Sequence, residues 1–366
     1  MTSGHDRWSF RECIVDFLIS MAQFRGSLFA KDRVLKLLSF LVFSSAIGVW
    51  YVNSAELSRR QSIMPSYPKL LDLFKSAMFA IMFVFVQWTF RAAATPIARS
   101  VVVKRPGWSR ELWVAKVDRF TAAIFKLVSS AVGLWILYFW ILKDAAWLPV
   151  SLFGQGTTEA CWGDDFPMQA VDENLRNFVL FAIGFVAADL VLLILKENSK
   201  PDFPELVLHL FVTLSLLVFS YLGNFMRLVS LVMMAHLICD VFVYTAKAMV
   251  DTKFSGGAFA YFPLLLVHVW FRLSVFANTL LKSAVVEAPK ALVAFNIDNE
   301  INEKGAGTLW AYICAMLGLS LLLHSYWGFV IVKIGLLLLT TGQSRDLQAN
   351  LSAMDVREEV KQKKKL

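Results

Sequence analysis

The sequence predicts an all-α protein, a bundle of about eight helices that cross a membrane. Hydrophobic residues make up 57% of the 366 residues and charged residues only 17%, whereas a soluble domain carries roughly 25% charged residues. The mean hydropathy is +0.59. The apolar residues also form long runs, and a helix needs about 20 such residues to cross the hydrocarbon core of a bilayer. These observations argue against an ordinary soluble fold.

The apolar runs follow one another along the chain, and each is interpreted as one span. The expected spans cover residues 35–53, 74–95, 120–142, 178–195, 205–222, 225–250, 258–281 and 309–340. A weak Gly223-Asn224 turn separates the fifth from the sixth, so a single bent helix there would change the number of spans. The last run is long enough to tilt or to extend beyond the membrane.

The distribution of charge predicts the orientation, because Lys and Arg collect in cytosolic loops. The 94–119 segment is basic and is expected in the cytosol, whereas the 143–177 segment is acidic and is expected in the lumen. An even number of spans then places both termini in the cytosol. The net charge of +8 therefore sits largely in segments expected to be cytosolic, and nucleic acid is not an expected partner.

The last four residues, KKKL, place lysines third and fourth from the C-terminus. This pattern matches a cytosolic dilysine signal for retrieval to the endoplasmic reticulum. The alternative is a solvated basic tail that lies near anionic lipid.

Ionisable groups inside a span are costly, so each is a candidate functional group. His209 and Thr213 lie four residues apart on one helical face, and His236 and Asp240 do the same on the next helix. An Asp one turn from a His is expected to accept its ring N–H and to raise its basicity. The alternative is that these groups only join helices by hydrogen bonds.

Three of the other ionisable groups in the expected spans carry further expectations. His324 is expected to line the same cavity, whereas His268 lacks an acidic neighbour and is expected to be structural. Asp189 is expected to be a pocket group or the partner of Arg227 or Arg272. A His-x-x-x-Asp pair can bind iron or zinc, but five histidines are too few for the several His-rich boxes of membrane desaturases, so no metal is expected.

The stretch from residue 209 to 247 resembles the longevity-assurance motif of ceramide synthases, which belong to the TLC domain family. That motif contains a His-His pair, a Thr, a Ser-aromatic-x-x-Asn-x-x-Arg segment, a His-Asp-x-x-Asp segment and an Ala-Lys pair. The matching positions in this sequence are His209, Thr213, Ser220, Tyr221, Asn224, Arg227, His236, Asp240, Ala246 and Lys247. Shorter similar segments lie at 90–98, 159–167, 200–203, 271–273 and 323–327.

The resemblance implies a TLC-type bundle that encloses a lipid or acyl cavity. It also implies the organisation of the chain: a cytosolic N-terminal segment (1–33), an additional span with a lumenal loop (34–73), a first family span with a basic loop (74–119), a catalytic membrane domain (120–340) and a cytosolic tail (341–366). The location it implies is the endoplasmic reticulum membrane.

The implied activity is acyl transfer from acyl-CoA, as co-substrate, to the amine of a sphingoid base such as sphinganine or sphingosine, with no permanently bound cofactor. By resemblance His209 is the nucleophile or base, and His236 and Asp240 are its partners. The residues expected to bind the two substrates are Thr213, Tyr221, Asn224, Arg227, Arg272, His324 and Trp327. The CoA phosphates are expected near Lys104, Arg105 or Lys200, and the loop at 282–308 corresponds to one that influences acyl-chain length in the family.

Two motif positions differ. Leu210 replaces the second His of the pair, and Leu237 replaces the first Asp of the His-Asp segment. Three hypotheses therefore stand: a working N-acyltransferase, a catalytically silent lipid- or CoA-binding partner of an active synthase, and a translocon-associated protein of the same fold. The first is preferred. By analogy the protein forms a homodimer or a heterodimer with another ceramide synthase.

Overall fold

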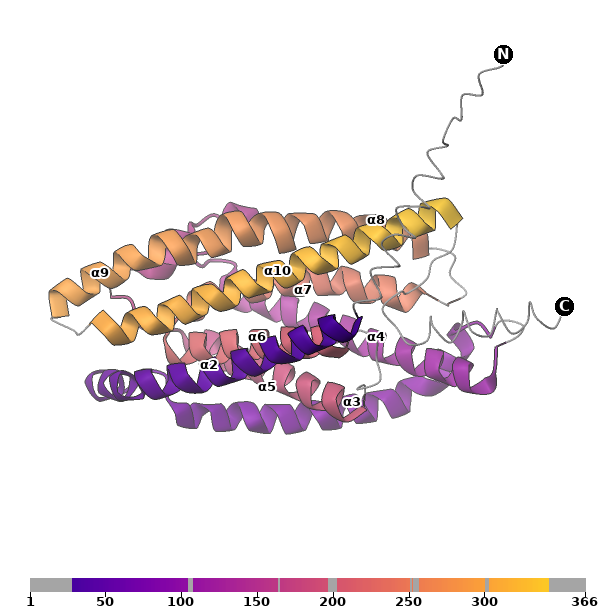
Figure 1. Cartoon of the computed structure of the whole chain (residues 1–366), viewed down its shortest axis with the longest axis horizontal. Coiled ribbons are helices and arrows are strands. Elements are labelled where there is room, and N and C mark those ends of the chain that lie inside the picture. The colour runs from indigo at the N-terminus through magenta and orange to yellow at the C-terminus, as the bar shows by residue number, and fades with distance from the viewer. Residues whose placement is uncertain are drawn as a thin grey trace, which may run out of the picture.

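The computed structural model describes residues 28–104, 108–163, 165–196, 203–250, 252, 257–299 and 303–341. Long helices run side by side along the molecule (Figure 1). The α-helices are α2 (Leu28–Ile63), α3 (Leu73–Val101), α4 (Arg110–Ile136), α5 (Glu173–Lys196), α6 (Phe203–Leu222), α7 (Met226–Met249), α8 (Gly257–Val267), α9 (Ala288–Asn299) and α10 (Glu303–Thr341). Three π-helices continue or join them: η3 (Leu137–Leu142), η6 (His268–Leu281) and η7 (Ser283–Glu287).

The described residues contain eight helical segments that are long and apolar enough to cross a membrane, so the prediction of a polytopic helix bundle is confirmed. The protein is a multi-pass membrane protein. The Gly223-Asn224 turn separates two helices, because α6 ends at Leu222 and α7 begins at Met226. Asn224 adopts the left-handed conformation with φ of 65°, which Asn tolerates better than most residues.

Side chains that accept backbone N–H groups fix where two helices begin. Ser109 precedes α4, and its hydroxyl accepts the Leu112 N–H at 3.1 Å. Asp172 precedes α5 and accepts the Asn174 N–H at 2.9 Å. These side chains pair N–H groups that have no partner within the helix.

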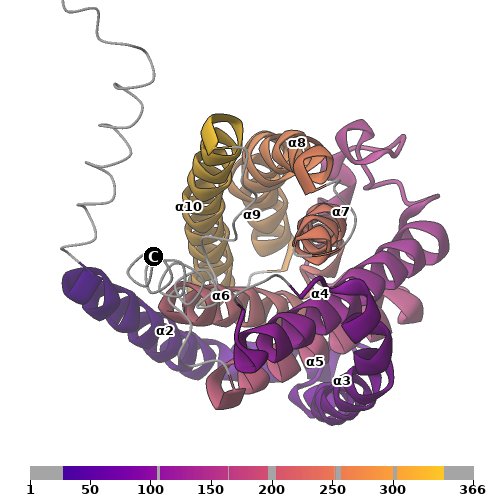
Figure 2. The ribbon, with the colours of Figure 1, turned by 90° about the vertical axis from the view of Figure 1, so that its right-hand side faces the viewer.

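The helices form a ring that is visible end-on in Figure 2. Around it, α4 packs against α7, α7 against η6, η6 against α10, α10 against α6, and α6 against α5. The ring is completed by α3, which packs against both α5 and α4. Helix α2 lies outside and contacts α6 and α10.

Close packing joins α3 to α5. The ring of Phe83 lies 4.7 Å from the ring of Phe181 and 4.9 Å from that of Phe185. Gly184 lets the two backbones approach, since a Cβ atom there would lie 2.6 Å from the Cβ of Phe79 and 2.6 Å from the Ser76 carbonyl oxygen. Helix α3 is therefore fixed beside α5, from where it reaches the interior of the bundle.

Candidate active site

Three histidines from three different helices meet inside the ring. The ring of His209 on α6 stacks on that of His236 on α7, with centroids 6.3 Å apart and an interplanar angle of 16°. His324 on α10 lies 4.9 Å from His236 and 6.1 Å from His209. The indole of Trp327 meets the His209 ring edge-on at 4.8 Å. The structure therefore brings together four of the residues that the sequence singles out.

Arg272 links this cluster to Asp240. One guanidinium nitrogen of Arg272, Nη1, lies 3.0 Å from Nε2 of His324. The other, Nη2, donates to Oδ1 of Asp240 at 2.6 Å and lies 3.4 Å from the His236 carbonyl oxygen. Arg272 belongs to the π-helix η6 and is buried. π-Helical turns are frequent at functional sites, and here one delivers a guanidinium to the centre of the bundle.

The hydrogen-bond partners determine which ring nitrogen carries the proton in two of the histidines. Guanidinium groups only donate, so Nε2 of His324 accepts from Arg272 and the ring proton is on Nδ1. A carbonyl only accepts, so Nδ1 of His236 carries the proton that it donates to the Val232 carbonyl at 2.8 Å. In the neutral ring, Nε2 of His236 is then the nitrogen that is able to accept a proton.

One expectation about this cluster is wrong. Asp240 is one helical turn from His236, but its carboxylate pairs with Arg272, whereas His236 donates to a backbone carbonyl of its own helix. The charged guanidinium forms a stronger hydrogen bond with a carboxylate than a neutral imidazole does. Asp240 therefore fixes Arg272, and Arg272 in turn fixes His324.

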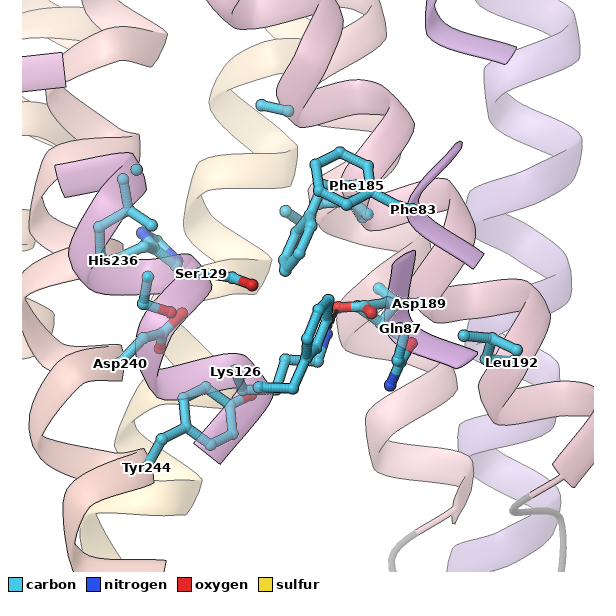
Figure 3. A pocket seen from close by; sticks show the side chains of 18 of the residues that line it. Phe83, Gln87, Lys126, Ser129, Phe185, Asp189, Leu192, His236, Asp240 and Tyr244 are labelled. Carbon is cyan, nitrogen blue, oxygen red and sulfur yellow. Dashed lines mark hydrogen bonds and ion pairs between the residues drawn. The ribbon is translucent and has the colours of Figure 1, made fainter. Parts of the chain in front are cut away.

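His209 and His236 border a cavity of about 1060 Å³. His324, which was expected to line the same cavity, contacts these two rings but is not among the residues that line it. Its walls are mainly apolar and come from α3, α4, α5, α6 and α7. Figure 3 shows His236, Asp240 and Tyr244 on one side of the space and Phe83, Gln87, Phe185 and Asp189 on the other. His209, Thr213 and Arg272 also line it. The Thr213 hydroxyl donates to the His209 carbonyl at 2.8 Å. The Nδ1 atom of His209 is buried and has no hydrogen-bond partner, as expected for a group that meets a ligand.

Three other predicted binding residues lie apart from the histidines. Tyr221 donates to Asp72 at 2.7 Å, and the Asn224 amide donates to the carbonyls of Pro167 and Gln169 at 2.7 and 2.8 Å. Arg227 donates to the Ala160 carbonyl at 3.0 Å and stacks over the Trp147 ring at 4.9 Å. The contacts of Asn224 and Arg227 hold the loop that contains Ala160, Pro167 and Gln169 against the α6–α7 turn, whereas the Tyr221 contact joins α6 to the residue that precedes α3. The substrate-binding role of the three residues stays a prediction.

Asp189 lines the cavity, which is one of its two expected roles, but it is not the partner of either expected arginine. Its carboxylate pairs with Lys126 of α4, and neither Arg227 nor Arg272 occupies that position. The Lys126 ammonium also lies 4.4 Å from the centre of the Phe185 ring. Sequence reasoning missed Lys126, although a lysine within an apolar run was a signal available for finding it. His268 is structural as expected, because its Nε2 lies 3.0 Å from the His324 carbonyl oxygen.

Metal ligation requires several suitable side chains in close reach. Within the described ranges, no group of three or more His, Cys, Asp or Glu side chains is arranged to hold a metal ion. Arg105 and Lys200, which were expected near the phosphates of a CoA, lie outside the described residues, and so does the KKKL end. Lys104 lies over the Trp113 ring at 6.0 Å.

A family model of the TLC domain matches residues 118–333, more than half of the chain. The chain belongs to the TLC domain family. The matched region of this TLC protein runs from α4 into α10 and contains all three clustered histidines together with Arg272 and Asp240. Helix α3 precedes it, although α3 supplies one wall of the cavity.

Several curated proteins are similar to this TLC protein. It is 28% identical to ceramide synthase 4 of Homo sapiens over 238 residues, which is 64% of this chain and 54% of that protein. It is 28% identical to ASC1-like protein 3 of Oryza sativa over 220 residues, 59% of this chain and 71% of that protein. It is 24% identical to the sphingosine N-acyltransferase lac1 of Schizosaccharomyces pombe over 341 residues, 89% of this chain and 83% of that protein. The chain thus spans about half the length of the human relative.

Proposed function

We propose that this TLC protein is a ceramide synthase, which transfers the acyl group of a fatty acyl-CoA to the amine of a sphingoid base. The observation that carries the proposal is the gathering of His209, His236 and His324, with His209 and His236 in the wall of an apolar cavity. Imidazoles are the side chains best suited to move a proton near neutral pH. The named relatives, a ceramide synthase and a sphingosine N-acyltransferase, support the same chemistry.

In the simplest scheme His209 acts as the general base. The amine nitrogen attacks the thioester carbonyl, His209 accepts the amine proton, the new C–N bond forms and the C–S bond breaks. The departing CoA thiolate then takes that proton, so charge and protons balance. The second scheme has the His209 ring accept the acyl group first and pass it to the amine. The unpartnered Nδ1 of His209 is compatible with either role.

The remaining groups act around the reacting atoms. The free Nε2 of His236 lies in a ring that stacks on His209, which suits it to accept or return a proton. Arg272 is a fixed cation near the cluster and lines the cavity, so it stabilises the negative charge that develops on the thioester oxygen. Asp240 and His324 hold Arg272 in place.

The cavity suits two long-chain substrates. A typical ligand pocket has about 300–1,000 Å³, and this cavity of about 1060 Å³ lies just above that range. Its apolar walls exclude water from the reacting groups, and Arg91, Arg119 and Lys247 line it as well. These cations, rather than Lys104, are the described groups that suit the phosphates of acyl-CoA. With the predicted orientation, they lie towards the cytosolic side.

Acyl-CoA dependence, the endoplasmic reticulum location and the cytosolic C-terminus belong to the same proposal. The test uses microsomes from cells that lack other sphingoid-base acyltransferases, supplied with acyl-CoA and sphinganine. We expect amide formation by the wild type, and a loss of at least a hundredfold for His209→Ala, since general base catalysis contributes about 10²–10⁴. Arg59→Gln, at an exposed position on α2, is the control and should match the wild type.

A second candidate is a catalytically silent TLC protein that binds lipid or CoA and partners an active synthase, as a homodimer or heterodimer. The observation that favours it is that Leu210 and Leu237 both line the cavity. These are the two positions at which this sequence differs from the family motif. The two leucines place apolar side chains at positions where the family motif has polar groups. Amide formation by the purified protein alone would exclude this candidate, whereas lipid binding without turnover would support it.

A further inference from the structure

The cavity separates α4 from α5, and one ion pair joins them across it. Helix α4 packs chiefly against α7, and α5 packs chiefly against α3 and α6. Lys126 of α4 and Asp189 of α5 line the cavity and pair with each other. Their side chains are 15% and 20% exposed. An ion pair in such surroundings is costly and is often no more stabilising than apolar packing, so its retention calls for a functional explanation.

The pair lies at about the depth of the histidines. Asp189 is seven residues before Lys196, where α5 ends, and His209 is six residues after Phe203, where α6 begins. These two helix ends are consecutive in the chain, and the helices pack against each other. At about 1.5 Å per residue, both groups are about 10 Å from the same face of the bundle. Figure 3 shows Asp189 and His236 facing the same space.

Lys126 has a second favourable position available. Its ammonium lies 4.4 Å from the centre of the Phe185 ring, and a cation over an aromatic face is stabilised. If another cation bound the Asp189 carboxylate and displaced Lys126 from it, the Lys126 ammonium would keep this aromatic partner. The carboxylate would also stay paired, because one ammonium would replace another.

We propose that the Asp189 carboxylate is the docking site for the ammonium group of a long-chain amine lipid, and that Lys126 occupies this site when the lipid is absent. The hydrocarbon chain of the lipid then lies along the apolar walls formed by α3, α4 and α5, and its amine is held at the depth of the imidazoles. This inference rests on the proposed function for the identity of the lipid as a sphingoid base. Asp189 is a binding residue, and Lys126 competes with the ligand.

The test measures equilibrium binding of radiolabelled sphinganine to the purified full chain in detergent, without acyl-CoA. Asp189→Asn should weaken binding about tenfold or more, since a hydrogen bond to a charged group contributes about 1.5–3 kcal/mol and 1.4 kcal/mol is tenfold. Asp189→Glu should restore most of it. Lys126→Met should strengthen binding, because the competing ammonium is gone.

The two single variants thus change binding in opposite directions. A pair that only joins α4 to α5 would instead make both variants weaken binding alike, and that result, or no change in either variant, would overturn the docking site. A long-chain diol that lacks the amine is the matched probe and should respond to neither substitution. Arg59→Gln is the protein control.

If Lys126→Met does not fold, the double variant Lys126→Met/Asp189→Leu serves in its place, because apolar residues replace a buried pair with little loss of stability. It should bind the amine and the diol equally. Preference for the amine in that variant would contradict the inference. Binding by the wild type with no amide formed on adding acyl-CoA would refute the proposed function and leave the docking site standing.

Discussion

Replacing Arg272 by Lys keeps the charge but removes the fork that joins two partners. Nη1 meets Nε2 of His324 at 3.0 Å and Nη2 meets Asp240 at 2.6 Å. A lysine ammonium is a compact point charge, so it holds one of these partners and not both. A hydrogen bond to a charged group contributes about 1.5–3 kcal/mol. Losing one that positions the reacting groups should lower kcat/KM about ten- to a hundredfold.

The assay is the initial rate of sphinganine N-acylation by purified wild type, Arg272→Lys, Asp240→Asn and the double variant. Because Asp240 acts by holding Arg272, the two substitutions should be strongly non-additive. KM for acyl-CoA should change less than kcat. A full rate for Arg272→Lys, or simple additivity of the two substitutions, would show that the guanidinium does not position the site.

Three further predictions concern the remainder of the bundle. Asn224→Gly keeps the left-handed backbone but loses the two amide hydrogen bonds. The free energy of unfolding should therefore fall by about 1–3 kcal/mol, with a lower melting temperature, while both KM values stay unchanged. A raised KM in a stable protein would instead support the predicted binding role of Asn224. Gly184→Val should destabilise the protein by about 1–3 kcal/mol, because its Cβ would meet Phe79, and normal thermal stability would contradict this packing. Burial raises the pKa of the Cys161 thiol, so maleimide should label it far more slowly in the folded protein than after denaturation, as mass spectrometry would show.

Much of the fold could be predicted from the sequence, because hydropathy reports directly on which residues face lipid. Hydropathy predicted the ends of the helices less accurately. The first span was expected at 35–53, whereas α2 continues to Ile63, where polar residues form further helical turns stabilised by the Glu56–Arg60 pair at 3.0 Å. The π-helix at His268–Leu281 was also missed. An apolar run indicates a helix but not the wider turn that carries Arg272 inward.

The site was predictable where it depends on local spacing. His209 and His236 lie on adjacent helices, and their polar neighbours four residues away marked them. The convergence of Arg272 with His324, 52 residues apart, depends on how η6 packs against α10. The Lys126–Asp189 pair joins residues 63 apart on helices that are separated by a cavity. Each charge was visible in its own apolar run, but only the folded bundle shows that they meet.

The most direct measurement is lipid mass spectrometry of the purified protein, incubated with sphinganine and a fatty acyl-CoA, for the wild type and for His209→Ala. We predict that the wild type forms the N-acylated base and that His209→Ala, with unchanged thermal stability, forms little or none. Absence of the amide from a well-folded wild-type preparation supplied with a range of acyl-chain lengths, or undiminished amide from His209→Ala, would contradict the assignment of acyl transfer to this histidine cluster.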